Sequence, residues 1–141
     1  MLTFAMLYLL DTNTCIAAMR NHPLVLQRMA AQSPGDCAIS TITGYELYTG
    51  VAKCANPAKE RSKVELLLAV LGELPFDADA AREAARIRAT LESQGSMIGP
   101  YDVLLAGHAI AAGLTLVTDN TGEFTRVAGL AVENWMMPPQ R

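Results

Sequence analysis

The stretch MLYLLDTN, residues 6–13, runs five apolar or aromatic residues directly into an acidic one. A short apolar run that ends in polar residues is typical of a strand buried inside a sheet. The pattern returns in LTLVTDN, residues 114–120, where Asp119 follows a second such run. These two segments, one near each end of the chain, therefore predict strands that each end in a carboxylate.

Helical patterns separate the predicted strands. We predict strands at residues 6–10, 37–41, 74–76, 114–118 and 130–133, and helices near 12–19, 24–31, 79–94 and 99–112. Two more helices are predicted from their first residues, since Thr43 to Glu46 has a capping-box pattern and Asn56-Pro57 combines an N-cap with proline. Strands that alternate with helices predict a parallel sheet covered on both faces, a three-layer α/β/α sandwich.

Length and composition are those of a compact protein. The 141 residues predict one domain over 1–141, and 51% hydrophobic with 18% charged residues excludes a disordered chain. The formal net charge of -3 argues against binding nucleic acid through overall charge. Any contact with RNA would need a local basic patch or a bound metal. Three arginines near residue 85 are best explained as one solvated helix face: Arg82, Arg86 and Arg88.

The N-terminus and the cysteines indicate a cytoplasmic protein. The first ten residues are apolar but lack the basic region of a signal peptide, and they are too few to span a bilayer. Met6 offers a second start, which would make residues 1–5 dispensable. The three cysteines have no CxxC spacing and cannot all pair, as expected for idle thiols in a reducing compartment: Cys15, Cys37 and Cys54.

Four acidic residues are candidates for one shared site. Asp11 and Asp119 directly follow predicted strands, Glu46 lies five residues past another, and Asp102 begins a helix. Sites in parallel sheets form beyond the carboxyl ends of the strands. Three of the four acids are therefore expected at one edge, and Asp102 joins them only if its helix begins there.

Each acid also has a purely structural explanation. Asp11 and Asp119 could be helix N-caps, Glu46 could close the capping box, and Asp102 could favour the positive end of a helix dipole. Converging carboxylates would raise one another's pKa values, and a bound cation would relieve the repulsion. Oxygen ligands alone suit Mg²⁺ or Mn²⁺ rather than zinc, and His22 and His108 have no zinc-like spacing.

Several short motifs, taken in order, resemble those of one family, the PIN-domain ribonucleases and especially VapC-type toxins of type II toxin–antitoxin systems. The motifs are MLYLLDTN at 6–13, ITGYELYTG at 42–50, GPYD at 99–102, LVTDN at 116–120 with Glu123-Phe124 and VAGL at 127–130, and ENW at 133–135. Together they cover essentially the whole chain.

The resemblance implies a PIN-like sheet of four or five parallel strands and a Mg²⁺- or Mn²⁺-dependent endoribonuclease that cuts tRNA or ribosomal RNA. Matched position by position, it implies core metal ligands Asp11, Glu46 and Asp102, a fourth acid Asp119, and supporting residues Asn13, Thr118 and Glu123, the last acting through water. It also implies a homodimer and a cognate antitoxin that silences the toxin. Such antitoxins commonly place an arginine in the acidic pocket.

Two other hypotheses stay open at this point. The chain could be a non-catalytic PIN-like subunit that binds RNA or protein, although such a subunit would be expected to have lost acids. It could also be a receiver-like phosphoacceptor domain, in which Asp77 follows a strand at 74–76. That design also needs a lysine after a late strand, and no lysine follows Lys63.

Overall fold

The computed structural model describes residues 6–139, so the expectation that residues 1–5 are dispensable lies outside the described part. Within this range the helices and strands follow one another as β1 Tyr8–Leu10, α1 Thr12–Met19, α2 Pro23–Ala30, β2 Cys37–Ser40, α3 Thr41–Lys53, α4 Pro57–Val70, β3 Gly72–Leu74, α5 Ala78–Ser93, α6 Pro100–Ala112, β4 Thr115–Val117, α7 Thr121–Phe124 and β5 Val132–Glu133. No helix in residues 6–139 is long and apolar enough to cross a membrane.

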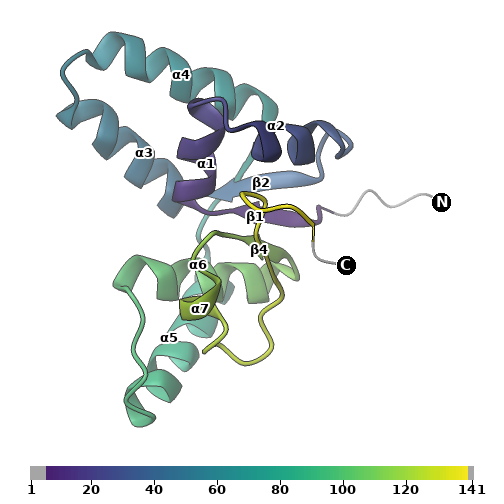
Figure 1. Ribbon diagram of the computed structural model, residues 1–141. Coiled ribbons are helices and arrows are strands. Elements are labelled where there is room, and N and C mark those ends of the chain that lie inside the picture. Colours follow the sequence, from purple (N-terminus) through teal and green to yellow (C-terminus); the bar gives the residue numbers. More distant parts are fainter. Residues whose placement is uncertain (1–5, 140–141) are drawn as a thin grey trace.

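The strands form one parallel sheet in the order β3-β2-β1-β4-β5. Figure 1 shows α1 to α4 on one side of the sheet and α5 to α7 on the other. The predicted three-layer sandwich with a parallel sheet is therefore confirmed. Because β1 lies between β2 and β4, segments from both ends of the chain meet at the centre of the sheet.

The strands alternate their side chains between two apolar cores. Leu9 and Leu116 pack with α5 and α6, whereas Leu10 and Val117 pack with α1 to α4 on the opposite face. All four are fully buried. Burying a side chain of this size stabilises the fold by roughly 2 kcal/mol, so both faces are firmly anchored. The anchored strands give their carboxyl ends fixed positions at one edge.

Helix α6 is held against α5 by unusually close packing at Gly107. A Cβ on Gly107 would come within 2.5 Å of the backbone nitrogen of Ala84, so only glycine permits this approach. The facing stripe of α5 is buried as predicted: Ala80, Ala84, Ile87 and Leu91. The close contact keeps α6 from shifting, and with it Asp102 in its first turn.

Two sequence predictions were wrong in detail. The capping box is not formed, because α3 begins at Thr41 with Ser40 as its N-cap, and Thr43 and Glu46 lie inside the helix. Strand β3 is Gly72–Leu74 rather than residues 74–76. Pro75 has no N–H to donate to the sheet, and the N–H of Phe76 donates to Thr41 Oγ1 at 3.0 Å instead.

Candidate active site

The carboxyl ends of the central strands bring the first acid into place. Leu10 pairs with Val117 across β1 and β4, and the next N–H along, that of Asp11, donates to the Val117 carbonyl at 2.9 Å. Thr118 and Asp119 directly follow β4. Asp11 and Asp119 therefore leave neighbouring strands at the same edge, as expected for a parallel sheet.

Asp11 is a buried carboxylate with its own hydrogen-bond partners. It is the N-cap of α1, where Oδ1 accepts a hydrogen bond from the N–H of Thr14 at 2.8 Å, so the capping explanation is confirmed for this residue. Burial raises the pKa of Asp11, while the hydroxyl of Thr118 and the bonds from Thr14 partly offset the rise. The charge of Asp119 raises this pKa further. Capping accounts for the position of Asp11 but not for the second carboxylate beside it.

Glu46 reaches the same region from α3. Its Oε1 accepts a hydrogen bond from Thr12 Oγ1 at 2.7 Å, and Thr12 follows Asp11 in the chain. The bond therefore ties the first turn of α1 to the middle of α3. Since Glu46 lies inside α3, its carboxylate is free to face other groups rather than to close a cap.

Asp102 is the residue on which the acids converge. It is half-buried in the first turn of α6, and its pKa is raised to about 7. Burial is the largest cause, followed by the charge of Glu123 and a hydrogen bond with it, and then by the charges of Asp11 and Glu46. Three carboxylates from three other segments thus act on Asp102, which a set of independent helix caps would not do.

Glu123 is more tightly integrated than the sequence indicated. Its Oε1 accepts a hydrogen bond from the N–H of Gly99 at 2.6 Å, and its Oε2 accepts one from the side chain of Asn120. A Cβ on Gly99 would lie 2.9 Å from Asp102 Oδ2, so a larger residue would press on that carboxylate. A side chain at this position would therefore displace the carboxylate of Asp102, which also forms a hydrogen bond with Glu123.

The remaining predicted residues lie in different surroundings. Asp119 is exposed, and it does not cap α7, whose N-cap is Asn120. Thr118 is fully buried and its Oγ1 accepts a hydrogen bond from the N–H of Asn120 at 3.0 Å. Asn13 is exposed.

Sequence reasoning missed the two threonines on either side of Asn13. Thr12 holds Glu46, and Thr14 binds Asp11 and also donates from its hydroxyl to the Val117 carbonyl at 3.2 Å. Their position beside the acid in the segment DTNT was the available signal.

The donor set fits a hard cation that keeps part of its water shell. Within residues 6–139, no group of three or more His, Cys, Asp or Glu side chains is arranged to hold a metal ion by itself. Mg²⁺ binds through one or two carboxylates and retains several waters, so it does not need an all-protein cage. Burial is the main cause of the raised pKa of Asp102, and the neighbouring carboxylates add to it, so a cation beside them would relieve the repulsion.

The histidines and cysteines serve the fold. His22 is the N-cap of α2, and His108 is buried with its Nδ1 2.8 Å from Ser40 Oγ. Burial raises the pKa of the Cys15 thiol, and it raises that of Cys37 to about 11. Both thiols are buried and free, which agrees with the expectation of idle cysteines.

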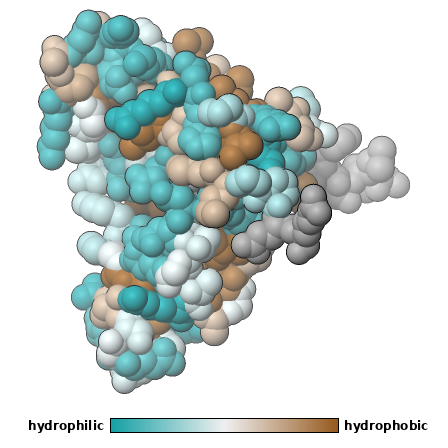
Figure 2. Space-filling view, in the orientation of Figure 1, coloured by the Kyte–Doolittle hydropathy of each residue, from teal (hydrophilic) through white to brown (hydrophobic). Residues whose placement is uncertain are grey.

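The basic side chains of α5 are engaged with acids on the same helix. Arg82 pairs with Asp79, Arg86 with Glu83, and Arg88 with Glu92. This arrangement confirms the expectation of a solvated helix face. In the view of Figure 2, apolar patches are small and separated by hydrophilic surface.

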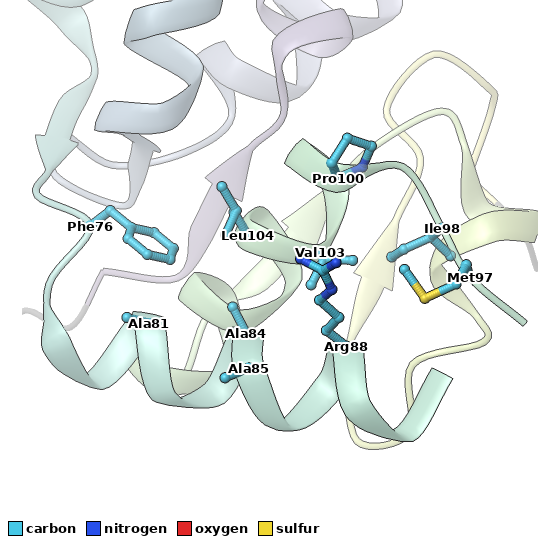
Figure 3. Close-up of a pocket in the computed structure, with 10 residues that line it drawn as sticks. All are labelled: Phe76, Ala81, Ala84, Ala85, Arg88, Met97, Ile98, Pro100, Val103 and Leu104. Carbon is cyan, nitrogen blue, oxygen red and sulfur yellow. The ribbon is translucent and has the colours of Figure 1, made fainter. Parts of the chain in front are cut away.

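A separate apolar hollow lies between α5 and α6. Figure 3 shows Phe76 at one end, Met97 and Ile98 at the other, and Arg88 reaching across from α5. Its volume is about 350 Å³, and its lining includes no carboxylate. The hollow is therefore distinct from the acidic site.

The receiver-like hypothesis does not agree with this geometry. Asp77 follows β3, which is an edge strand, whereas a phosphoacceptor must follow a central one. The Asp77 carboxylate instead caps α5, accepting a hydrogen bond from the N–H of Ala80 at 2.9 Å.

Comparison with known proteins assigns the family. The sequence pattern of the PIN domain matches residues 8–130, which include Asp102 and the three acids that converge on it. This chain belongs to the PIN-domain family. The resemblance seen in the motifs, including its VapC type, is thereby confirmed.

Named relatives and solved structures support this assignment over nearly the whole chain. The tRNA(fMet)-specific endonuclease VapC of Shigella flexneri is 39% identical over 128 residues, which are 91% of this chain and 97% of that protein. The structure of DNA-bound VapBC from Salmonella typhimurium matches with a TM-score of 0.88 and 38% identity, over 92% of this chain and 98% of that one. VapBC2 of Rickettsia felis, bound to a promoter DNA fragment, matches with a TM-score of 0.84 and 36% identity, over 92% and 99%.

Proposed function

We propose that this PIN domain is a divalent-metal-dependent endoribonuclease whose substrates are structured RNAs of the tRNA or ribosomal class. The observation that carries the proposal is the convergence of Glu123, Asp11 and Glu46 on the half-buried Asp102, where burial and then these neighbouring carboxylates raise the pKa of Asp102 to about 7. Buried like charges cost stability, so they indicate a site kept for chemistry. The relatives named as nucleases support the same reaction.

In this proposal, some side chains would hold the metal ion and others would position them. Asp11, Asp102 and Glu46 would hold Mg²⁺ or Mn²⁺, with Asp119 as a fourth acid and Glu123 reaching the ion through water. When bound, the cation supplies an activated water and offsets charge on the phosphodiester. Thr14 and Thr118 orient Asp11, and Thr12 orients Glu46. Glu123, anchored by Gly99, positions Asp102.

The test is cleavage of purified tRNA and ribosomal RNA with Mg²⁺, with Mn²⁺ and with a chelator. Wild type should cut only with metal, and Asp11→Asn should lose the activity. Asp79→Asn is the matched control, because Asp79 is an exposed acid on α5 away from the site. Sequencing the ends of the products would identify the RNA and the cleavage position. Equal cutting by wild type and Asp11→Asn would reject the proposal.

We also propose that the chain is the toxin of a cytoplasmic toxin–antitoxin pair and forms a homodimer. The solved relatives are VapBC assemblies, and the acid cluster would accept a bidentate arginine from an antitoxin. Expression alone should arrest growth, and co-expression with the product of an adjacent reading frame should restore it. Light scattering on the purified chain should give twice the monomer mass. Growth that continues without the partner would contradict the toxin assignment.

One observation favours a second candidate, a non-catalytic binding subunit. Residues 6–139 contain no group of three or more His, Cys, Asp or Glu side chains arranged to hold a metal ion. Calorimetric titration with Mg²⁺ and Mn²⁺ separates the two candidates. Binding that Asp102→Asn weakens supports the nuclease, and an absence of binding heat and of cleavage supports the binding subunit.

A further inference from the structure

Tyr45 and Tyr101 form an exposed aromatic pair outside both apolar cores. Their side chains are 55% and 43% exposed, and neither belongs to an apolar core. The two hydroxyl oxygens lie 3.2 Å apart, and the ring centroids are 5.7 Å apart with the planes tilted by 47°. Two large rings are thus held together at the surface by contacts with each other.

The pair lies at the edge of the acidic site. Tyr45 directly precedes Glu46 in α3, and Tyr101 directly precedes Asp102 in α6. Glu46 acts electrostatically on both Asp102 and Tyr101, so the acids and the rings are close in space as well as in sequence. The hydrogen bond between the hydroxyls spans the two helices. An RNA strand that crosses α3 and α6 at this point would contact the rings beside Glu46.

The charges of the protein leave RNA binding incompletely explained. The net charge is -3, the acids repel phosphate, and the arginines of α5 are already paired with carboxylates. Stacking of a base on an aromatic ring does not depend on charge and tolerates any base. A phenol also offers an apolar face at a low cost in side-chain entropy.

We propose that Tyr45 and Tyr101 form a stacking platform for an unpaired base of the RNA next to the phosphodiester that is cut. This proposal rests on the nuclease function proposed above. Bases within an A-form duplex are stacked on one another, so only an unpaired or extruded base can lie on these rings.

The test measures binding of a labelled single-stranded oligoribonucleotide, and of a blunt duplex of the same sequence, by fluorescence anisotropy at low salt with a chelator. The paired substitution Tyr45→Leu with Tyr101→Leu should weaken single-strand binding by roughly tenfold or more, because stacking is lost. Tyr45→Phe with Tyr101→Phe should stay within about twofold, since the rings remain. Tyr48→Leu is the matched control, because Tyr48 is an exposed tyrosine on the same helix.

Kinetics with metal give a second measurement. The leucine pair should raise KM and leave kcat nearly unchanged, and single strands should bind more tightly than duplexes. The proposal is overturned if wild type does not bind the single strand, if the leucine pair binds and cuts normally, or if the phenylalanine pair or Tyr48→Leu loses as much binding. It is also overturned if the leucine pair changes the oligomeric state, since the rings would then serve a protein interface. A wild type that binds single strands but does not cut RNA would reject the nuclease function alone.

Discussion

Two buried polar clusters lie at the same end of the fold and differ in how their charges are balanced. Ser40 and His108 face each other at 2.8 Å, and burial lowers the pKa of His108, so the pair is neutral at pH 7. Asp11 and Asp102 instead lie near other carboxylates, although Asp11 also accepts hydrogen bonds from Thr14 and Thr118, and burial raises both pKa values. In the first cluster, Ser40 and His108 form a hydrogen bond with each other and carry no net charge. The carboxylates of the second cluster repel one another, and a bound cation would relieve that repulsion.

The neutral cluster also supports the charged one. Ser40 Oγ accepts a hydrogen bond from the N–H of Ile42 and caps α3, the helix that carries Glu46. His108 lies on α6, the helix that carries Asp102. One buried hydrogen bond therefore links the two helices that carry half of the converging acids. Residues of the neutral cluster should therefore stabilise the fold, whereas the acids should destabilise it. Substitutions in each cluster can test this difference.

The largest expected effect is on RNA cleavage. Asp102→Asn and Asp11→Asn should each lower kcat/KM by about 100-fold or more, because each removes a charge from the proposed metal site. Asp119→Asn should cost less than about tenfold, since Asp119 is exposed and could be replaced by water. Initial rates with a fixed Mg²⁺ concentration measure all three. A loss for Asp119→Asn that equals the loss for Asp102→Asn would break the distinction between buried and exposed acids.

The sequence predicted much of this site for a clear reason. Asp11 and Asp119 directly follow strands, and the rule for parallel sheets places such residues at one edge. It did not predict the contacts of Glu123, because one of them is with the backbone N–H of Gly99, more than twenty positions earlier. The two residues lie in different elements, so strand order and helix spacing do not predict that they meet.

The second effect is on stability. Ser40→Ala removes both the cap of α3 and the partner of His108, and it should lower the free energy of unfolding by roughly 2 kcal/mol. Urea denaturation measures the change, and Ser62→Ala, at an exposed serine on α4, is the control. If Ser40→Ala unfolds like Ser62→Ala, the buried pair does not stabilise the fold.

The role of Ser40 as the N-cap of α3 could not be derived from sequence. Thr43 and Glu46 have the spacing of a capping box, so local chemistry favoured a later helix start. Ser40 is the cap because β2 ends in the buried interior, where its hydroxyl also meets His108 from a distant segment. Tertiary contact decided between two residues that local preferences allow equally.

The third expected effect is a gain in stability, in contrast to the loss expected for Ser40→Ala. The folded pKa of Asp102, about 7, lies above its usual value, so this group stabilises the fold at low pH and loses that contribution as pH rises through about 7. Without metal at pH 8, the free energy of unfolding of Asp102→Asn should therefore exceed that of wild type by about 1 kcal/mol after allowance for solvent screening. Urea denaturation measures this difference. This difference in the free energy of unfolding between the variant and wild type should become smaller toward pH 5. A variant that is less stable than wild type at pH 8 in chelator would show that the carboxylate is already balanced within the protein.

The smallest effect tests the neutral cluster by pH. The folded pKa of His108 lies below 6.5, so the unfolded chain binds more protons and stability falls as pH drops below about 6.5. The groups that face this side chain are Ser40, Phe76 and Asp77, and the charge of Asp77 acts in the opposite direction. His108→Gln cannot titrate but can still bind Ser40 through its amide. Between pH 7.5 and 5.5, wild type should lose up to about 1 kcal/mol more stability than His108→Gln. Parallel pH dependence in the two proteins would mean that His108 takes up its proton while folded, and that the cluster is not held neutral by burial.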